Sequence, residues 1–441
     1  MNEEFRISNE ELRERRTPRI LHSKFFIRNS RFIFLLALTL ACTSRPPNQD
    51  RLKFWALGHE GEVVAQLLPE FTRRTGIRVD VQQIPWSAAH EKLLTAYVGD
   101  ATPDAAQMGN TWIPEFNAVG SLEPLDPFLA RSTIRQSDYF PGIWATNVVG
   151  NVVYGVPWYV DTRVMFYRTD FVPKPPRTWA EWVAAMQHVK NQRPNSHAIL
   201  LPTNEYEQVE ILAMGNGATL LNPSGTEGDF HDPRFVQALQ FYVEMFRRGY
   251  APVLSTTQVA NVYQGFAQGD FAMYITGPWN VGEFRKRLPP SMNGKWMTAP
   301  MPAPRADLYP GTSMAGGASL IIFRDSKKKD AAWKLIEFLS EPAQQIRFYE
   351  LTQDLPAHRD AWKVPAVAND PPLAAFRVQL EHVAPLPRVP EYEQIATDVA
   401  EDQEAVVRGR MTIERMVADL DAKANRALEK RRWVLARAAS R

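Results

Sequence analysis

Residues 51–81 read RLKFWALGHEGEVVAQLLPEFTRRTGIRVDV, and this stretch decides the fold class. Its apolar residues form first a short run, then a helical spacing, then an alternation with charged residues. We therefore predict a strand over 52–57, a turn over 58–61, a helix that ends at Gly76, and a second strand over 77–81. This order of elements indicates α/β architecture.

Two residues carry more detailed expectations about the helices. Pro69 lies inside the helical spacing, where its ring removes a backbone donor and crowds the preceding turn, so we expect it to kink the helix. Ser87 has a side chain that caps helices well, and we expect it to begin the next helix.

Two apolar runs, 105–108 and 271–275, each lead into a turn that carries a tryptophan. We predict strands there, because the runs are short and bounded by turn residues. In an open α/β sheet, ligands bind at loops that follow the carboxyl ends of strands. Asn110, Trp112 and Trp279 are therefore candidate ligand contacts.

Length and charge limit the possible functions. The chain has 441 residues, of which 45% are apolar and 11% aromatic, enough to bury one large core or two ordinary ones. We expect two lobes. The net charge is +2, and from residue 51 onward 42 basic residues face 43 acidic ones. A nucleic-acid-binding surface needs an excess of positive charge, so we expect no nucleic-acid partner.

Cys42 is the only cysteine of the sequence and cannot form an internal disulfide. Residues 32–41 before it form an uncharged apolar run that follows Arg28 and Arg31, as in a signal peptide. The run is too short to remain as a transmembrane helix. Residues 38–42 read LTLAC and resemble a bacterial lipobox, in which the cysteine is acylated and becomes the new N-terminus.

This resemblance implies a signal peptide over residues 1–41 and a lipidated tether over 42–50 that holds the protein outside the cytoplasmic membrane. The polar, proline-containing tether has the composition of a short flexible linker. Residues 1–27 are long and highly charged for the start of a signal peptide, which leaves open a translation start downstream of Met1. An uncleaved anchor with an incidental Cys42 is the alternative.

Three stretches come close to catalytic motifs without completing them. Residues 90–94 begin like a zinc-protease helix, but Leu94 stands where the second histidine is needed. Residues 311–315 lack the closing glycine of a nucleophile elbow, and residues 215–220 fail the dinucleotide fingerprint at the last position. The eight histidines show no metal-ligand spacing. We therefore expect no metal, no cofactor and no enzymatic activity. A glycoside hydrolase remains a minority alternative, because two carboxylates could flank one bond.

Tryptophans stand beside turn residues at several places in the sequence. A sugar ring presents faces of C–H groups and rims of hydroxyls, so a sugar site needs flat aromatic rings together with carboxylates and amides. Segments 58–61, 110–112, 158–161 and 276–280 combine these residue types. Four tryptophans, including Trp158 of the segment 158–161, are nevertheless expected in the core: Trp86, Trp144, Trp158 and Trp333.

A series of short motifs follows a characteristic order from Arg51 to Arg426. The series runs Phe54-Trp55 through Glu70-Phe71, Ile84-Pro85-Trp86 with His90-Glu91-Lys92-Leu93, Thr102-Pro103-Asp104, Gly109-Asn110-Thr111-Trp112, Gly277-Pro278-Trp279, Gly316-Gly317 and Asp354-Leu355-Pro356. This order resembles the family 1 extracellular solute-binding proteins, which serve ATP-driven sugar importers.

The resemblance implies an α/β, two-lobe periplasmic-binding-protein fold of type II-like form, with lobes joined by crossing hinge segments and a ligand cleft between them. It assigns residues 51–161 plus 318–377 to the N-terminal lobe and residues 162–317 plus 378–441 to the C-terminal lobe. It also implies a set of ligand contacts. They are Glu60 as an acidic hydroxyl acceptor, Tyr159 and Asp161 as a crossover pair, Trp279 as the stacking ring, Gly317 as a backbone donor and Arg388 as a basic contact.

The function implied by the resemblance is capture of a carbohydrate, either a monosaccharide or an oligosaccharide. Ala318 stands where some relatives carry a second aromatic residue, which argues against a large, doubly stacked oligosaccharide. Closure of the lobes on the ligand would precede docking on the permease of an ABC importer with a cytosolic ATPase.

We expect a periplasmic or otherwise extracytoplasmic monomer, attached to the membrane only through the lipid on Cys42. A polyamine or metal-chelate receptor on the same fold is the alternative. It requires a strongly acidic cleft or paired tyrosines, and the balanced charge does not favour it.

Overall fold

The computed structural model describes residues 51–439, so the predicted signal peptide, the tether and Cys42 lie outside the described residues. The described residues fall within one compact unit. No helix in this part of the chain combines the length and the apolar character that crossing a bilayer requires.

The larger of two main sheets has six strands. They are β1 (Arg51–Leu57), β2 (Arg78–Ile84), β3 (Ala105–Gly109), β6 (Val156–Asp161), β12 (Gly316–Ile322) and β13 (Leu355–Pro356). Their order across the sheet is β13-β6-β12-β3-β1-β2. Strand β1 is parallel to both of its neighbours, whereas β12 runs antiparallel between β3 and β6.

The first stretch of the chain follows the predicted order with one difference. Strands β1 and β2 confirm the two predicted strands, and Gly76 ends the intervening helical segment with a φ of 72°. Residues 58–61 do not form a turn. They begin helix α1 (Gly58–Val64) directly after β1, so the helix starts at the carboxyl edge of the strand.

The two detailed helix predictions are corrected by the structure. Pro69 does not kink one helix but lies in the first turn of a second one, α2 (Leu68–Thr75), where a missing N–H costs nothing because first-turn donors have no partner within the helix. The prediction for Ser87 was wrong, since α3 (Trp86–Val98) begins one residue earlier, after Pro85.

The second main sheet has four strands: β7 (Val164–Arg168), β8 (Ile199–Leu200), β9 (Met273–Thr276) and β10 (Trp296–Ala299). Their order is β10-β7-β9-β8, and β7 is antiparallel to both neighbours. Strand β9 confirms the apolar run predicted near residue 271, displaced by two residues at its start. Five helices belong to this part of the chain: α7 (Trp179–Gln192), α8 (Glu207–Gly215), α9 (Pro233–Arg247), α10 (Val262–Gln268) and α11 (Trp279–Arg287).

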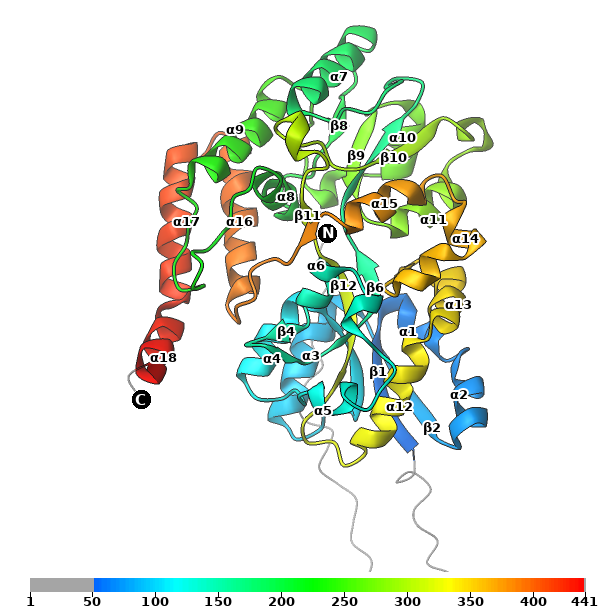
Figure 1. Ribbon diagram of the computed structural model, residues 1–441. Helices are drawn as coiled ribbons and strands as arrows, with labels where there is room; N and C mark the ends of the chain where they lie inside the picture. The colour runs from blue at the N-terminus through cyan, green and yellow to red at the C-terminus, as the bar shows by residue number, and fades with distance from the viewer. Residues whose placement is uncertain (1–50, 440–441) are drawn as a thin grey trace, which may run out of the picture. The chain divides into compact units, whose positions relative to one another are not determined.

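The chain crosses between the sheets in short segments. Residues 162–163 link β6 to β7, and Ala315 links β11 (Ser313–Met314) to β12. Strand β11 pairs in parallel with β14 (Val383–Ala384), which lies on a further connecting segment. Figure 1 shows β6 and β12 of the lower sheet leading toward the upper elements. The α/β architecture predicted from the sequence is therefore confirmed.

The longer helices of the last third of the chain pack partly on the sheets and partly on other helices. They are α12 (Lys329–Ser340), α13 (Pro342–Thr352), α15 (Leu373–Leu380), α16 (Tyr392–Val407), α17 (Ile413–Ala427) and α18 (Glu429–Ala439). One hydrophobic cluster includes both Phe54 of β1 and Phe166 of β7, so buried contacts continue from one sheet to the other. The lobe boundaries implied by the sequence stay a prediction.

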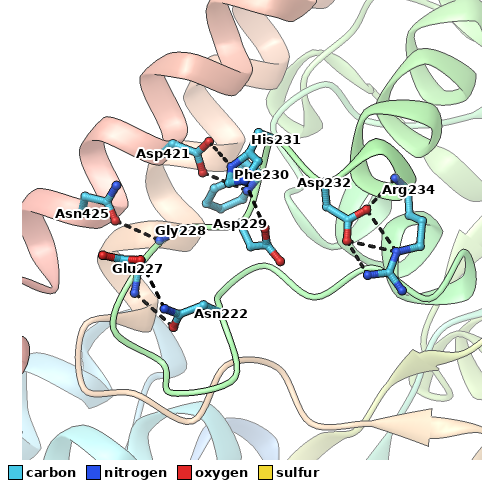
Figure 2. Close-up of polar contacts among 10 residues, drawn as sticks. All are labelled: Asn222, Glu227, Gly228, Asp229, Phe230, His231, Asp232, Arg234, Asp421 and Asn425. Atoms are coloured by element: carbon cyan, nitrogen blue, oxygen red, sulfur yellow. Dashed lines mark hydrogen bonds and ion pairs between the residues drawn. The ribbon is translucent and has the colours of Figure 1, made fainter.

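The link between α8 and α9 is fixed to helix α17, as Figure 2 shows. The Phe230 N–H donates to Asp421 Oδ1 at 2.9 Å, and His231 Nδ1 lies 2.8 Å from Asp421 Oδ2. The Gly228 N–H donates to Asn425 Oδ1 at 3.0 Å. The hydrogen bond and charge of Asp421 raise the pKa of the exposed His231 imidazole. This contact is therefore strongest when His231 is protonated.

Candidate functional site

A cavity of about 520 Å³ is lined by residues at the six-stranded sheet and by residues of the helices and links that connect strands of the four-stranded sheet. Pockets for small ligands usually measure about 300–1,000 Å³. Seven of the eight predicted contact residues line it: Glu60, Asn110, Trp112, Tyr159, Asp161, Trp279 and Gly317. The fold thus gathers residues that are far apart in the sequence, and their contact with a ligand stays a prediction.

Glu60 lies in the first turn of α1 and is only 8% exposed. Its Oε1 accepts a hydrogen bond from the Tyr159 hydroxyl at 2.8 Å. Gln107 Nε2 donates to that hydroxyl oxygen at 3.0 Å, and Gln107 Oε1 accepts from the Leu57 N–H at 2.8 Å. Burial and the nearby carboxylates of Glu60 and Asp354 raise the pKa of Tyr159 well above its usual value, so the hydroxyl keeps its proton.

Trp86 and Trp112 form one wall of the cavity. Trp86 is 37% exposed, and its Nε1–H donates to the two oxygens of Glu60 at 3.3 and 3.4 Å. The Trp86 and Trp112 rings meet edge to face with their centroids 5.6 Å apart. The prediction of Trp86 as a core residue was therefore wrong. The other three tryptophans expected in the core are buried: Trp144, Trp158 and Trp333.

Asn110 begins a short 3₁₀ helix (Asn110–Trp112) that directly follows β3. Its side chain is buried, and its Oδ1 accepts a hydrogen bond from the Ser319 hydroxyl at 2.8 Å. Its Nδ2 has no hydrogen-bond partner within the described part of the chain. A buried donor left unpaired costs about 1–3 kcal/mol, so an acceptor on a ligand would relieve this cost.

Arg163, in the link between β6 and β7, is the one basic residue among the described residues that line the cavity. Its Nη1 donates to both oxygens of Asp161 at 2.7 and 2.6 Å, and its Nη2 donates to Glu207 Oε1 at 3.2 Å. Burial opposes the charge of Arg163, but Asp161 and Glu207 outweigh burial and raise its pKa. Burial also raises the pKa of Asp161, and Arg163 reverses part of that rise.

Asp354 lies between α13 and β13 and also lines the cavity. Burial, followed by the nearby Glu60 carboxylate, raises the pKa of Asp354 well above its usual value. Two carboxyl groups that share a desolvated site resist ionising together. With Asp161 and Glu207 the wall holds four carboxyl groups against the single guanidinium of Arg163. The cavity is thus more acidic than the nearly neutral chain, which the overall charge did not indicate.

Trp279 follows the carboxyl end of β9, as predicted, but it begins helix α11 instead of lying in a loop. The residue is 39% exposed. A Cβ atom on Gly277 would come within 1.9 Å of the indole, so a glycine is needed for the ring to lie against this turn. The guanidinium carbon of Arg163 lies 4.8 Å from the ring centroid.

The structure gives a reason, not evident from the sequence, why residue 317 is a glycine. Its φ of +115° is strained for any residue with a side chain, and a Cβ atom would lie 2.3 Å from the Tyr159 carbonyl oxygen. The close approach of β12 to β6 therefore requires glycine here. Its predicted role as a backbone donor to a ligand remains a prediction.

Arg388 is the predicted contact that does not line the cavity. Its side chain is exposed, and its Nη1 donates to the carbonyl oxygens of Ala145 at 3.1 Å and Val148 at 3.0 Å. It borders a smaller hollow that shares Asn110 and Thr111 with the main cavity.

Eleven lining residues were not predicted as contacts, and six of them have charged, aromatic or thioether side chains: Trp86, Arg163, Tyr206, Glu207, Met314 and Asp354. Trp86 and Asp354 lie in motifs that the sequence had singled out, so a signal existed for them. The other four come from α8 and the crossing segments, where no local pattern marks a binding residue. Within residues 51–439, no group of three or more His, Cys, Asp or Glu side chains is placed to hold a metal ion.

Comparison with known proteins gives a family match over most of the chain. A family model described as bacterial extracellular solute-binding protein matches residues 55–346. A putative binding protein of Brucella abortus is 27% identical over 374 residues, which cover 80% of this chain and 87% of that protein.

Solved structures give the same result. The sugar-binding protein MalE of Xanthomonas citri is 47% identical with a TM-score of 0.84, and the match covers 87% of this chain and 99% of that chain. An ABC-transporter solute-binding protein of Thermotoga lettingae, solved with α-D-tagatose bound, is 25% identical with a TM-score of 0.73 and coverages of 86% and 100%. These matches confirm the predicted two-lobe periplasmic-binding-protein fold.

Proposed function

Because this chain belongs to the family of bacterial extracellular solute-binding proteins, we propose that it captures a sugar and delivers it to the permease of an ABC importer. The observation that carries the proposal is the cavity wall, which combines the exposed rings of Trp86 and Trp279 with oxygen-rich side chains. The Xanthomonas citri relative is named a sugar-binding protein, and the Thermotoga lettingae relative holds α-D-tagatose.

The residue types fit the two kinds of surface on a sugar. The indole faces cover the C–H groups of the ring, since aromatic side chains bury large apolar areas. The carboxylates of Glu60 and Asp161 accept hydrogen bonds from hydroxyls, and the unpartnered Asn110 Nδ2 donates to a hydroxyl oxygen. No basic side chain without a carboxylate partner lies among the described lining residues, so an uncharged sugar fits better than a sugar acid or phosphate.

Capture works by closure of two lobes. Glu60 and Asn110 follow strands of the six-stranded sheet, whereas Trp279 and Glu207 lie on helices that connect strands of the four-stranded sheet. A ligand that touches both sets binds the closed arrangement more tightly than the open one, and this difference shifts the equilibrium toward closure. The closed protein then docks on the permease, whose ATPase subunits lie in the cytosol.

The protein acts from outside the cytoplasmic membrane, tethered by a lipid on Cys42. Metabolic labelling with palmitate tests this part: the wild-type protein should incorporate label and Cys42→Ser should not. Equal labelling, or release of both proteins into the soluble fraction, would contradict the anchor.

Isothermal titration calorimetry tests the sugar. The protein without residues 1–44, which retains the compact unit 50–441, is titrated with maltose, trehalose, glucose and α-D-tagatose. Spermidine is included because the cavity is acidic. Saturable binding of at least one sugar is expected. If spermidine binds and none of the sugars does, the ligand is a polyamine and not a sugar.

The protein binds its sugar without converting it. The raised pKa of Asp354 beside Glu60 resembles the acid and base pairing of glycosidases, so this point needs its own test. Purified protein incubated with maltotriose should release no reducing ends above the buffer control. Release that disappears in Asp354→Asn would establish a hydrolase instead.

A further inference from the structure

We propose that Arg163 is a positioning residue of the sugar site, which holds the Trp279 ring and the Asp161 carboxylate in the orientations that the ligand meets. The inference rests on the proposed function, because it adds a residue to the same site. It concerns a side chain that neither the family motifs nor the sequence pattern had marked.

Two contacts constrain the ring of Trp279. The backbone of Gly277 lies so close to the indole that no Cβ would fit between them, and the guanidinium of Arg163 lies 4.8 Å from the ring centroid. A guanidinium at this distance attracts the electron-rich ring face. Without Arg163 the ring would lose one of these two contacts, while 39% of the residue is exposed. A partly exposed indole with fewer contacts can change rotamer, and the ligand would then have to order it.

The same guanidinium fixes the carboxylate of Asp161. Both carboxylate oxygens accept from Nη1, at 2.7 and 2.6 Å, and the Arg163 side chain is only 13% exposed. Nη2 reaches Glu207 on α8 at 3.2 Å. One planar group thus sets the positions of an acceptor at the end of β6, a carboxylate on α8 and a ring on α11.

The backbone of Arg163 is itself held in place. The Arg163 N–H donates to the Ser313 hydroxyl oxygen at 3.2 Å, and the same hydroxyl donates to the Arg163 carbonyl oxygen at 2.9 Å. Ser313 lies on β11, the strand that leads back to β12. Two crossing segments therefore support the guanidinium, and its position does not depend on a mobile loop.

Lysine cannot replace arginine in this role. Its ammonium is a compact charge that would pair with a carboxylate, but it lacks the flat fork that stacks on a ring while donating in two directions. Arg163→Lys therefore separates charge from shape, because it keeps the positive charge between Asp161 and Glu207 and removes the planar contact with Trp279.

A double-mutant cycle tests the proposal. Wild type, Arg163→Gln, Arg163→Lys, Trp279→Ala and the Arg163→Lys/Trp279→Ala double variant are titrated with whichever of the four sugars named above the wild type binds most tightly. Both single Arg163 variants are expected to weaken binding at least tenfold, which corresponds to about 1.4 kcal/mol. Trp279→Ala is expected to cost much less in the Arg163→Lys background than in the wild type, since the ring is no longer held in place.

Arg168 provides a matched control on the neighbouring strand. It is also buried, ion-paired with Asp170 and stacked on Phe171 at 4.3 Å, but it does not line the cavity. Arg168→Lys should leave sugar affinity within twofold of the wild type.

Three outcomes are decisive. The proposal is overturned if the Arg163 variants bind the sugar within twofold of the wild type. It is also overturned if the affinity losses of the two single changes multiply in the double variant. Neither result contradicts the proposed function as a sugar receptor. If Arg163→Gln does not fold, the test rests on Arg163→Lys, because this variant keeps a cation beside both carboxylates. If the wild type binds none of the sugars, the proposed function fails and this inference fails with it.

Discussion

Replacing Trp279 with alanine is expected to weaken sugar binding about 10- to 60-fold. A tryptophan side chain presents about 150–250 Å², and 39% of Trp279 is exposed toward solvent, which leaves about 60–100 Å² for a ligand to cover. At about 25 cal/mol per Å², covering this area is worth about 1.5–2.5 kcal/mol. A factor of ten in affinity corresponds to about 1.4 kcal/mol, which gives the range stated.

Isothermal titration calorimetry of wild type and Trp279→Ala, at equal pH and salt, measures this loss. Trp433→Ala is the control, because Trp433 on α18 is 58% exposed and does not line the cavity. The control should bind like the wild type. A loss below twofold for Trp279→Ala would refute the reasoning, since it would mean that the ligand leaves the exposed indole uncovered.

Three other changes give predictions of different kinds. Trp86→Phe keeps an aromatic ring, although a smaller one, and removes the donor to Glu60. The hydrogen bond at 3.3 Å is worth about 1 kcal/mol, so sugar affinity measured by calorimetry should fall at least about fivefold. Unchanged affinity would mean that the bond does not orient Glu60. The pKa of His231 is raised by Asp421, so its ion pair stabilises the fold below about pH 6.5, the ordinary histidine value, and this contribution is lost as the pH rises through the raised pKa. The difference in Tm between wild type and His231→Ala should therefore be larger at about pH 5.5 than at about pH 8.5, and the opposite trend would contradict the assignment. Gly317→Ala introduces a Cβ into the β6 backbone at a φ of +115°, so urea unfolding should show a loss of about 2–4 kcal/mol, whereas wild-type stability would mean that β12 can move away at no cost.

The local sequence pattern predicts the main elements of this fold well because their signals are short-range. The alternation over 77–81 and the glycine at position 76 act within a few residues, and the structure has β2 and the helix end there. The errors concern positions where two local preferences compete. Pro69 could kink one helix or begin another, and the sequence alone does not say which, because both respect its missing N–H.

The residues of the cavity were predicted in part, because some of them follow local sequence patterns. Asn110 and Trp279 follow strands that the pattern identifies, so the rule about carboxyl ends of strands locates them, whereas Glu60 came from the family resemblance. Arg163 and Glu207 are charged residues 44 positions apart, and only the crossing of the chain brings them together. Trp86 was predicted as a core residue because most tryptophans are buried, and its hydrogen bond to Glu60 is a tertiary contact without a sequence signal.

The relay of hydrogen bonds that ends at Glu60 has a direction. The Leu57 N–H donates to Gln107 Oε1, which turns Gln107 Nε2 toward the Tyr159 oxygen, and the Tyr159 proton is then committed to the carboxylate. Each donor along this path points toward Glu60, whose carboxylate oxygens accept. A deoxyfluoro sugar carries a fluorine of about the size of a hydroxyl but without a proton to donate. Its fluorine would face the acceptor oxygens of Glu60, so this sugar should bind more weakly than the parent sugar.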